Sequence, residues 1–212
     1  MSSRVVEIFE DKTLIERIKK RLPYLYQIAE LECSRAGHIG MEVGSVREKI
    51  IVALLIYKFG ETNVNTEIPI TRPEVDAEIF GQPISIKTIT KQGKGFGGVK
   101  ISWTVDAPKA QEFLNEYSPH CDMVLVRIVW GGNGGLYYIP RETQQDLLDR
   151  IGRENYIKLP KPSTNPRGVE IKDMALSQLV EDKDAKAISI SWQKSVIDYQ
   201  PYKRWVDFWR EE

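Results

Sequence analysis

Residues 74–90 have the sequence EVDAEIFGQPISIKTIT, and this stretch decides the fold. Acidic and apolar side chains alternate from Glu74 to Ile79, which is the two-residue period of a β-strand. Gly81-Gln82-Pro83 predicts a turn, and Ile84–Thr90 predicts a second strand. The pattern therefore indicates a β-hairpin with acidic side chains on one face.

Helices are expected before this hairpin. Apolar residues recur at helical spacing over residues 12–36, with a break or kink at Pro23. Residues 37–44 predict a loop punctuated by glycine, and Ser45-Val46-Arg47-Glu48 matches a capping box that would start a helix ending near Phe59. The body of that helix, Ile50–Tyr57, is apolar on every side, which predicts burial all round.

A glycine-rich stretch follows the hairpin. Residues 91–100 hold too much glycine to pack, which predicts a mobile or ligand-ordered loop. Beyond it the sequence predicts strands near 100–105, 122–130, 136–139 and 187–192, helices near 108–117 and 141–151, a proline-rich segment at 159–168, a short helix and a tryptophan-rich tail at 202–209. Helices before and after a central mixed sheet predict an α/β (α+β) fold.

Composition bounds the class of protein. With 212 residues, 42% of them hydrophobic, the chain can close one sizeable core, and a single domain over 1–212 is expected. Thirty basic and thirty acidic side chains balance, so any polyanion must meet a local basic surface. Two cysteines without metal-ligand spacing and no long apolar run predict a soluble, cytoplasmic protein with no membrane partner.

Two residues of the hairpin suggest phosphodiester hydrolysis. This reaction at neutral pH needs a divalent cation, an acid that holds it and a group that orients the attacking water. Asp76 would lie near the bend, beside Lys87 on the second strand. Because side chains alternate, Ser85 and Lys87 share one face. Ile86 then faces the core and offers its backbone carbonyl to the metal.

With these residues the sequence resembles the PD-(D/E)XK nucleases, and most closely the ThaI family of type II restriction endonucleases, over essentially the whole chain. The resemblance places Asp76 at the metal-binding acid and Lys87 at the lysine that ends the motif. Ser85 stands where the class usually has Asp or Glu. The resemblance implies that Glu48 replaces this acid from the upstream helix, although Ser45-x-x-Glu48 is otherwise a common helix cap.

The resemblance also implies a restriction-endonuclease-like core, Mg²⁺ as the cofactor and cleavage of double-stranded DNA at CGCG. A palindromic site predicts a homodimer in which each subunit cuts one strand. Residues 1–44 would supply a helical lead and a DNA-contacting loop, 45–130 the catalytic core, and 131–212 the elements of recognition and dimerisation.

Candidate DNA contacts lie on both sides of the hairpin. Four lysines and no acid occur from Ile79 to Val105, and they suit phosphate contacts. Met41, between glycines, is a candidate wedge for the minor groove at a pyrimidine-purine step, or else it covers the core. Asn and Arg of the proline-rich segment have the geometry to read base edges. The expected DNA-binding set is Met41, Ser85, Lys91, Lys94, Lys100, Asn165 and Arg167.

Two other functions stay open on the sequence. A junction resolvase or repair nuclease could share the same core and cut without a fixed sequence. A DNA-binding protein with an inactive site would fit Ser85 in the place of the acid. A second motif-like triplet, Glu170-Ile171-Lys172, follows residues that hold no acid from Asn155 to Val169, and prolines there argue against a partner strand.

Overall fold

The computed structural model describes residues 3–35, 38–69, 71–72, 74–102, 106–160 and 168–211. Its helices are α1 (Val6–Glu10), α2 (Lys12–Glu32), α3 (Val43–Phe59), α4 (Ala107–Glu116), α5 (Arg141–Ile151), α6 (Arg153–Tyr156), α7 (Asp173–Glu181) and α8 (Lys203–Arg210), with a 3-10 turn at Glu61–Asn63. No helix in these ranges is long and apolar enough to cross a membrane.

A six-stranded mixed sheet forms the centre, in the order β11-β8-β7-β5-β4-β3. Only β5 and β7 pair in parallel, and the other neighbours in this sheet are antiparallel. Its strands are β3 (Val64–Asn65), β4 (Ala77–Ile79), β5 (Gln82–Thr90), β7 (Asp122–Ile128), β8 (Gly132–Ile139) and β11 (Lys186–Trp192). Two smaller sheets contain β1 (Ser34–Arg35) with β2 (His38–Ile39), and β6 (Val99–Ser102), β10 (Val169–Ile171) and β9 (Ile157–Lys158). The mixed α/β class expected from the sequence is confirmed.

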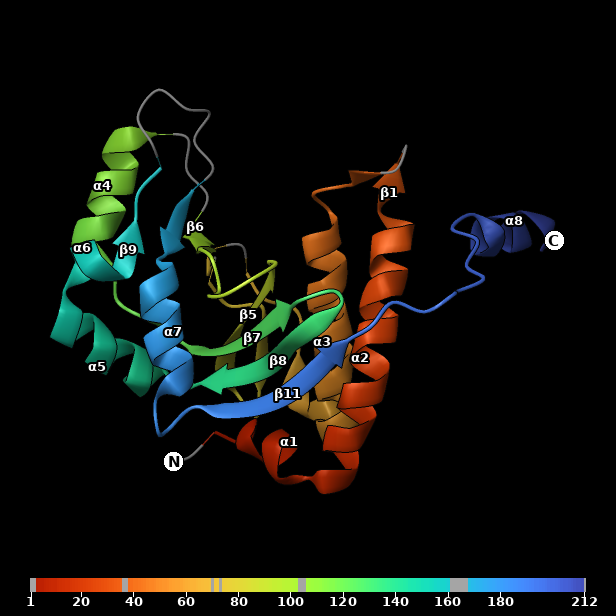
Figure 1. Ribbon diagram of the computed structural model, residues 1–212, viewed down its shortest axis with the longest axis horizontal. Coiled ribbons are helices and arrows are strands. Elements are labelled where there is room, and N and C mark those ends of the chain that lie inside the picture. Colours follow the sequence, from red (N-terminus) through yellow and green to blue (C-terminus); the bar gives the residue numbers. More distant parts are fainter. Residues whose placement is uncertain are drawn as a thin grey trace.

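Each face of the central sheet has its own core. Ile84 and Ile86 of β5 face the core shared with α1, α2 and α3. Ile89 of β5 and Leu125 of β7 face the other core, which α4 to α7 complete. Figure 1 shows α2 and α3 on one side of the sheet and α4 to α7 on the other, while α8 stands away from the body at the end of an extended arm. The sheet is thus the middle layer between two groups of helices.

The hairpin exists as expected, with different bounds. β4 begins at Ala77 rather than Glu74, and Gln82 already pairs with Ile79, so the turn lies at Phe80-Gly81. Both turn residues have positive φ, 50° and 78°, which fits the twist of a two-residue hairpin. The predicted turn at Gly81-Gln82-Pro83 was therefore placed one residue too late.

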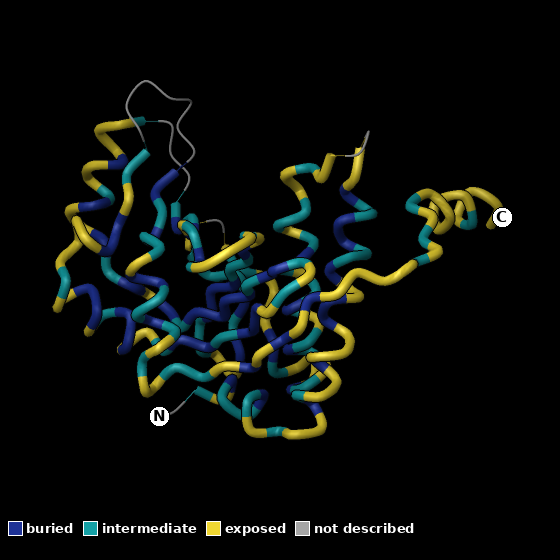
Figure 2. The backbone as a smooth tube through the Cα atoms, viewed as in Figure 1, coloured by how far each residue is buried: buried dark blue, intermediate teal, exposed yellow. Residues whose placement is uncertain are grey.

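Two predictions about the helix α3 are wrong. It begins at Val43, its N-cap Glu42 makes no side-chain cap, and Ser45 lies inside the helix, so the capping box does not form. The helix is also not buried all round, because its buried face holds Ile51, Leu55 and Phe59 while Tyr57 is 61% exposed. Figure 2 shows this one-sided burial along α2 and α3.

The glycine-rich stretch packs, contrary to the prediction. Phe96 is 7% exposed and belongs to the core beneath α7. Asp173, the first residue of α7, accepts hydrogen bonds from the backbone N–H groups of Phe96 (2.5 Å) and Gly97 (2.9 Å). Arg127 donates to the Gly93 carbonyl at 2.7 Å. Side chains from two other elements thus hold a backbone that glycine alone would leave free.

The strand that contains the second triplet does have a partner strand, contrary to the prediction. β9 pairs with β10, matching Ile157 to Ile171. Glu170 forms an ion pair with Lys158 at 2.9 Å, and Lys172 donates to the Glu154 carbonyl. These side chains take part in the small sheet and its surroundings.

Candidate active site

The edge of β5 next to β4 is the centre of the site. β4 pairs with β5 only as far as Ala77 and Ile84, and the Asp76 N–H donates to the Ile84 carbonyl at 2.9 Å. Beyond that point, no strand of the described residues pairs with this edge of β5. The Asp76 carboxylate takes the place of the missing strand, because it accepts the Ile86 N–H at 2.6 Å. The position of this carboxylate is thereby fixed by the N-terminal end of β4, which Asp76 directly precedes.

Lys87 shares the same carboxylate. Its Nζ lies 3.3 Å from Asp76 Oδ2, and the two side chains are 16% and 24% exposed. The Ser85 hydroxyl lies 3.5 Å from the same oxygen. Ile86 is fully buried in the opposite core, as the alternation of side chains predicts. The hairpin therefore brings together the Asp and Lys that the sequence singled out.

The Ile86 carbonyl lies on the same edge as Asp76. In a strand, the N–H and C=O of one residue point to the same side. Since the Ile86 N–H is directed at Asp76, its carbonyl oxygen is directed toward the same side of β5. An oxygen acceptor is thus available beside the carboxylate.

Glu48 approaches from α3. Burial raises the pKa of the Glu48 carboxyl above its usual value, the negative charge of Asp76 raises it further, and the Lys87 ammonium acts in the opposite direction. Such charge effects act between neighbours. Because the helix begins at Val43, Glu48 is not in a cap, and its carboxylate is free of that structural role.

Glu74 is a further acid at this site, and it is not among the site residues predicted from the sequence. Burial raises its pKa to about 7, opposed by Lys87 and by a hydrogen bond from the His120 backbone. Its own backbone carbonyl accepts from the Cys121 thiol at 3.7 Å. The signal was present in the sequence, because Glu74 precedes Asp76 by the two residues that return a strand to the same face.

The donor set suits a hard divalent cation. Asp76, Glu48 and the Ile86 carbonyl supply oxygen atoms, which Mg²⁺ prefers. The mutual repulsion of Asp76 and Glu48 is what a cation between them would relieve. Across the described ranges, no group of three or more His, Cys, Asp or Glu side chains is close enough to form a metal site by itself. A backbone oxygen or further ligands from substrate and water would complete the shell.

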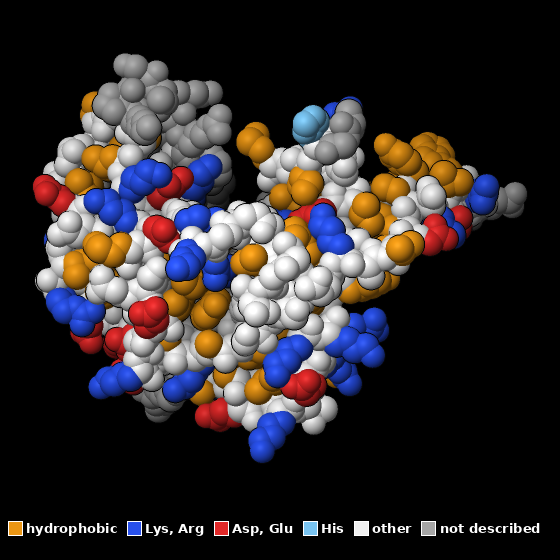
Figure 3. All heavy atoms as spheres, in the orientation of Figure 1, with side chains coloured by type: hydrophobic (Ala, Val, Ile, Leu, Met, Phe, Trp, Pro, Cys, Tyr) orange, Lys and Arg blue, Asp and Glu red, His pale blue; other side chains and the backbone are white. Residues whose placement is uncertain are grey.

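The expected phosphate contacts differ in their surroundings. Lys91 pairs with Asp173 at 3.3 Å, so its charge is partly neutralised. Lys94 lies in the loop held by Asp173, and Lys100 lies on β6. The space-filling view shows a hollow between the α4–β6 side and the tip of α2 and α3, with Lys and Arg side chains along one wall (Figure 3).

Met41 lies at the tip of α2 and α3, between the β1–β2 hairpin and the start of α3. Its side chain is 93% exposed, and Ile39 beside it is 48% exposed. The alternative that Met41 folds back over the core is therefore wrong. Asn165 and Arg167 lie outside the described residues.

Comparison with known proteins shows the family of the chain. The family model of the restriction endonuclease ThaI matches residues 8–211. A solved structure described as "Restriction endonuclease in complex with substrate DNA" is 54% identical in sequence and has a TM-score of 0.91, with 99% of this chain and 100% of that chain covered. No curated protein sequence matches the chain.

Proposed function

The chain belongs to the family of the restriction endonuclease ThaI, and we propose that it cleaves double-stranded DNA at CGCG in a Mg²⁺-dependent reaction carried by Asp76, Glu48 and Lys87. As a type II restriction endonuclease, it acts on DNA. The observation that carries the assignment of residues is the Asp76 carboxylate, which contacts Lys87 and the Ile86 N–H. Burial raises the pKa of the nearby Glu48, and the charge of Asp76 raises it further.

Asp76, Glu48 and the Ile86 carbonyl would hold the cation. Bound there, Mg²⁺ would offset charge on the scissile phosphate and lower the pKa of a water molecule. Lys87, whose side chain is mostly buried next to Asp76, would orient the attacking water. Water adds to phosphorus, the bond to the 3′ oxygen breaks, and the products are a 5′ phosphate and a 3′ hydroxyl.

Ser85 cannot supply the acid that its position has in most PD-(D/E)XK nucleases. It is 5% exposed, and its hydroxyl lies near Asp76. Glu48 replaces this acid. Burial is the main cause of its raised pKa, and the second cause, the negative charge of Asp76, supports the assignment because such charge effects act between neighbours. Ser85 then contributes to the shape of the site where the DNA backbone would pass.

The DNA would lie in the hollow between the tip of α2 and α3 and the β6 side. Met41, almost fully exposed, suits a wedge between base pairs from the minor groove. Lys91, Lys94 and Lys100 would contact phosphates, and Asn165 and Arg167 base edges. A pyrimidine-purine step such as CG unstacks comparatively easily, which agrees with a CGCG target.

A palindromic site is matched by two subunits related by a two-fold axis. The homodimer that we propose would place one site on each strand. The interface between the two subunits would include α8, because Trp205, Phe208 and Trp209 of this helix are 51%, 59% and 90% exposed.

Plasmid DNA incubated with the protein and Mg²⁺, followed by sequencing of the ends, tests the proposal. We expect uniform ends at CGCG with wild type and no cleavage with Asp76→Ala. Scattered or branch-dependent ends would indicate a repair nuclease or resolvase instead. Intact DNA that stays bound by the wild-type protein would indicate a DNA-binding protein with an inactive site.

A further inference from the structure

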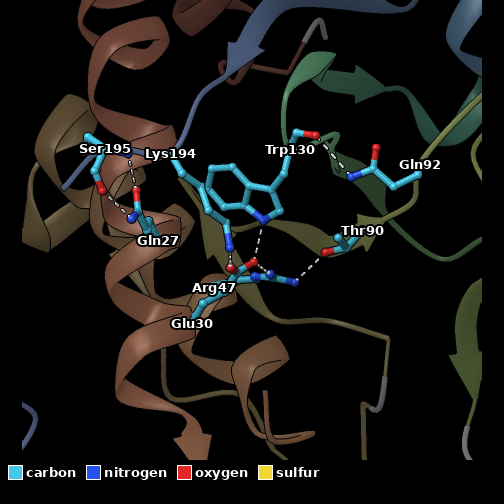
Figure 4. Close-up of polar contacts among 8 residues, drawn as sticks. All are labelled: Gln27, Glu30, Arg47, Thr90, Gln92, Trp130, Lys194 and Ser195. Atoms are coloured by element: carbon cyan, nitrogen blue, oxygen red, sulfur yellow. Dashed lines mark hydrogen bonds and ion pairs between the residues drawn. The ribbon is translucent and has the colours of Figure 1, made fainter. Parts of the chain in front are cut away.

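A buried network of charged and polar side chains lies beside the start of α3. Glu30 of α2 is 4% exposed and accepts hydrogen bonds from Arg47 (2.6 Å) and the Trp130 indole (2.7 Å) on one oxygen. Lys194, on the arm after β11, pairs with the other oxygen at 3.0 Å and lies over the Trp130 ring. Figure 4 shows these groups converging from four segments of the chain.

Arg47 connects this network to the central sheet. Its guanidinium donates to Glu30 through one nitrogen and to the Thr90 hydroxyl through another, at 2.9 Å. Its side chain is 7% exposed, and its contact with Glu30 is buried. Thr90, the last residue of β5, is exposed, so its contact with Arg47 is only partly shielded from water. In the described part of the chain, the bond to Thr90 is the only side-chain hydrogen bond between α3 and β5.

The two ends of that bond lie close in sequence to the catalytic residues that we propose. Arg47 directly precedes Glu48 on α3, and Thr90 follows Lys87 by three residues on β5. When a strand supplies both the acid and the lysine, the backbone sets their distance. Here Ser85 occupies the strand position and the acid comes from a helix, so a contact between helix and strand must set that distance.

Stability alone does not account for a buried ion pair in this place. Apolar side chains of similar volume often stabilise a protein as well as such a pair does. A guanidinium has a fixed planar fork that orients its two acceptors relative to one another. Arg47 thereby fixes α2, α3 and β5 in one arrangement, which an apolar contact would leave looser.

We propose that Arg47 is a positioning residue, which holds Glu48 against the Asp76–Lys87 pair through its hydrogen bond to Thr90. The inference rests on the proposed function. It assigns Arg47 no contact with DNA or metal. Residues that orient metal ligands in this way affect metal affinity or activity by about 10–100-fold when changed.

Removal of the Thr90 hydroxyl is the sharpest test, because Arg47→Met risks unfolding the protein. Thr90→Val removes the acceptor and keeps the shape of the side chain. Thr88→Val makes the same change on the same face of β5, at a hydroxyl that makes no hydrogen bond among the described residues. Lys194→Met removes the outer cation of the network but leaves the bond between Arg47 and Thr90.

Three quantities are measured for each variant: the affinity for Ca²⁺ by calorimetry in the complex with a CGCG duplex, the single-turnover cleavage rate in Mg²⁺, and the dissociation constant for DNA. We expect Thr90→Val to lower the Ca²⁺ affinity and the rate by about 10-fold or more, with DNA affinity and unfolding temperature as in Thr88→Val. Higher Mg²⁺ should partly restore the rate. Lys194→Met should keep the Ca²⁺ affinity of wild type.

Equal Ca²⁺ affinity and equal rates for Thr90→Val and Thr88→Val would overturn the inference. Failure of the proposed function looks different. It would appear as wild-type cleavage by Glu48→Gln, whatever the Thr90 variant does. The two outcomes can be told apart because one concerns the Glu48 carboxylate itself and the other concerns the contact between Arg47 and Thr90 that positions it.

Discussion

Asp76 is the residue on which both the local structure and the proposed chemistry depend. Its carboxylate accepts the Ile86 N–H, lies beside the Ser85 hydroxyl and pairs with the Lys87 ammonium. The first contact continues the pairing of β4 and β5 by one side chain. The last lies in a mostly buried place, where an ion pair is less screened than at the surface.

Substitutions of Asp76 separate these roles. Asp76→Asn keeps an oxygen that can accept the Ile86 N–H, whereas Asp76→Ala leaves that donor unsatisfied. We expect Asp76→Ala to lower the free energy of unfolding by about 1–3 kcal/mol more than Asp76→Asn does. Both should lose cleavage, because neither retains a charged metal ligand. Urea unfolding and a cleavage assay measure the two effects. Equal stability of the two variants would show that the hydrogen bond from the Ile86 N–H does not stabilise the fold.

The raised pKa of Glu74 predicts how the stability of the protein depends on pH in the absence of divalent metal. Its folded-state pKa, about 7, exceeds the ordinary value of 4.5, so the folded state holds the proton more tightly. The contribution of Glu74 to the free energy of unfolding is therefore most favourable below pH 4.5, and it is lost as the pH rises toward 7. The loss is at most about 3 kcal/mol, and smaller because Glu74 keeps some contact with solvent.

Glu74→Gln is the matching variant for that prediction. It removes the titrating group and keeps most of the shape. The free energy of unfolding, measured from pH 4.5 to 7.5 with EDTA present, should fall with pH in wild type more steeply than in Glu74→Gln. Parallel curves for the two proteins would show that Glu74 does not titrate in this range.

At the scale of single elements, the glycine-rich loop depends on one side chain of α7. Asp173 accepts two backbone N–H groups and pairs with Lys91. The hydrogen bonds lower the pKa of the Asp173 carboxyl in spite of its partial burial. The loop is therefore held by a helix that follows it by more than seventy residues.

Asp173→Ala should free residues 91–98. We expect a loss of about 1–3 kcal/mol in the free energy of unfolding, because two backbone donors lose their acceptor. Hydrogen exchange of the Phe96 and Gly97 amides should become faster. Lys91→Ala is the control, since it removes only a half-exposed ion pair, which contributes about 0–1 kcal/mol. If both variants exchange at the same rate, the ion pair holds the loop and the backbone bonds do not.

The sequence predicted elements whose signals are local. The alternation around Asp76 gave the hairpin, and the same alternation placed Lys87 and Ile86 on opposite faces, as the structure has them. Prediction from local sequence patterns failed where the structure differs from what those patterns indicate. The start of α3 lies before Ser45 although Ser45 and Glu48 match a capping box. The packing of Phe96 depends on Asp173, and no local pattern near the loop reveals that partner.

At the scale of the whole molecule, α8 is a helix whose side chains all remain at least partly exposed to solvent. The helix has no buried residue, and four aromatic side chains, Tyr202, Trp205, Phe208 and Trp209, are more than half exposed. An isolated helix of eight residues is marginal in water. Arg204 pairs with Glu32 of α2, which attaches the helix to the body by its polar side. The aromatic side of α8 is left exposed, and we propose that it packs against a second copy of this chain.

The area is sufficient for such a dimer. Aromatic side chains bury about 150–250 Å² each, so two copies of α8 contribute on the order of 1,000 Å², and the surfaces that cover them lose a similar area. A stable interface buries about 1,600 Å² in total. Replacing Trp205, Phe208 and Trp209 by Ser should shift the protein from dimer to monomer in sedimentation, while Lys203→Ser should not. A dimer that survives the triple change would place the interface elsewhere.

The most direct measurement concerns the acid on α3. Glu48→Gln and Glu42→Gln remove the same charge from the same end of the helix, but Glu42 is exposed at the N-cap and Glu48 lies near Asp76. Single-turnover cleavage of a CGCG duplex in Mg²⁺ is measured for both. We expect a rate at least about 100-fold lower for Glu48→Gln and a rate close to wild type for Glu42→Gln. Cleavage by Glu48→Gln at the wild-type rate would show that the reaction does not need the Glu48 carboxylate.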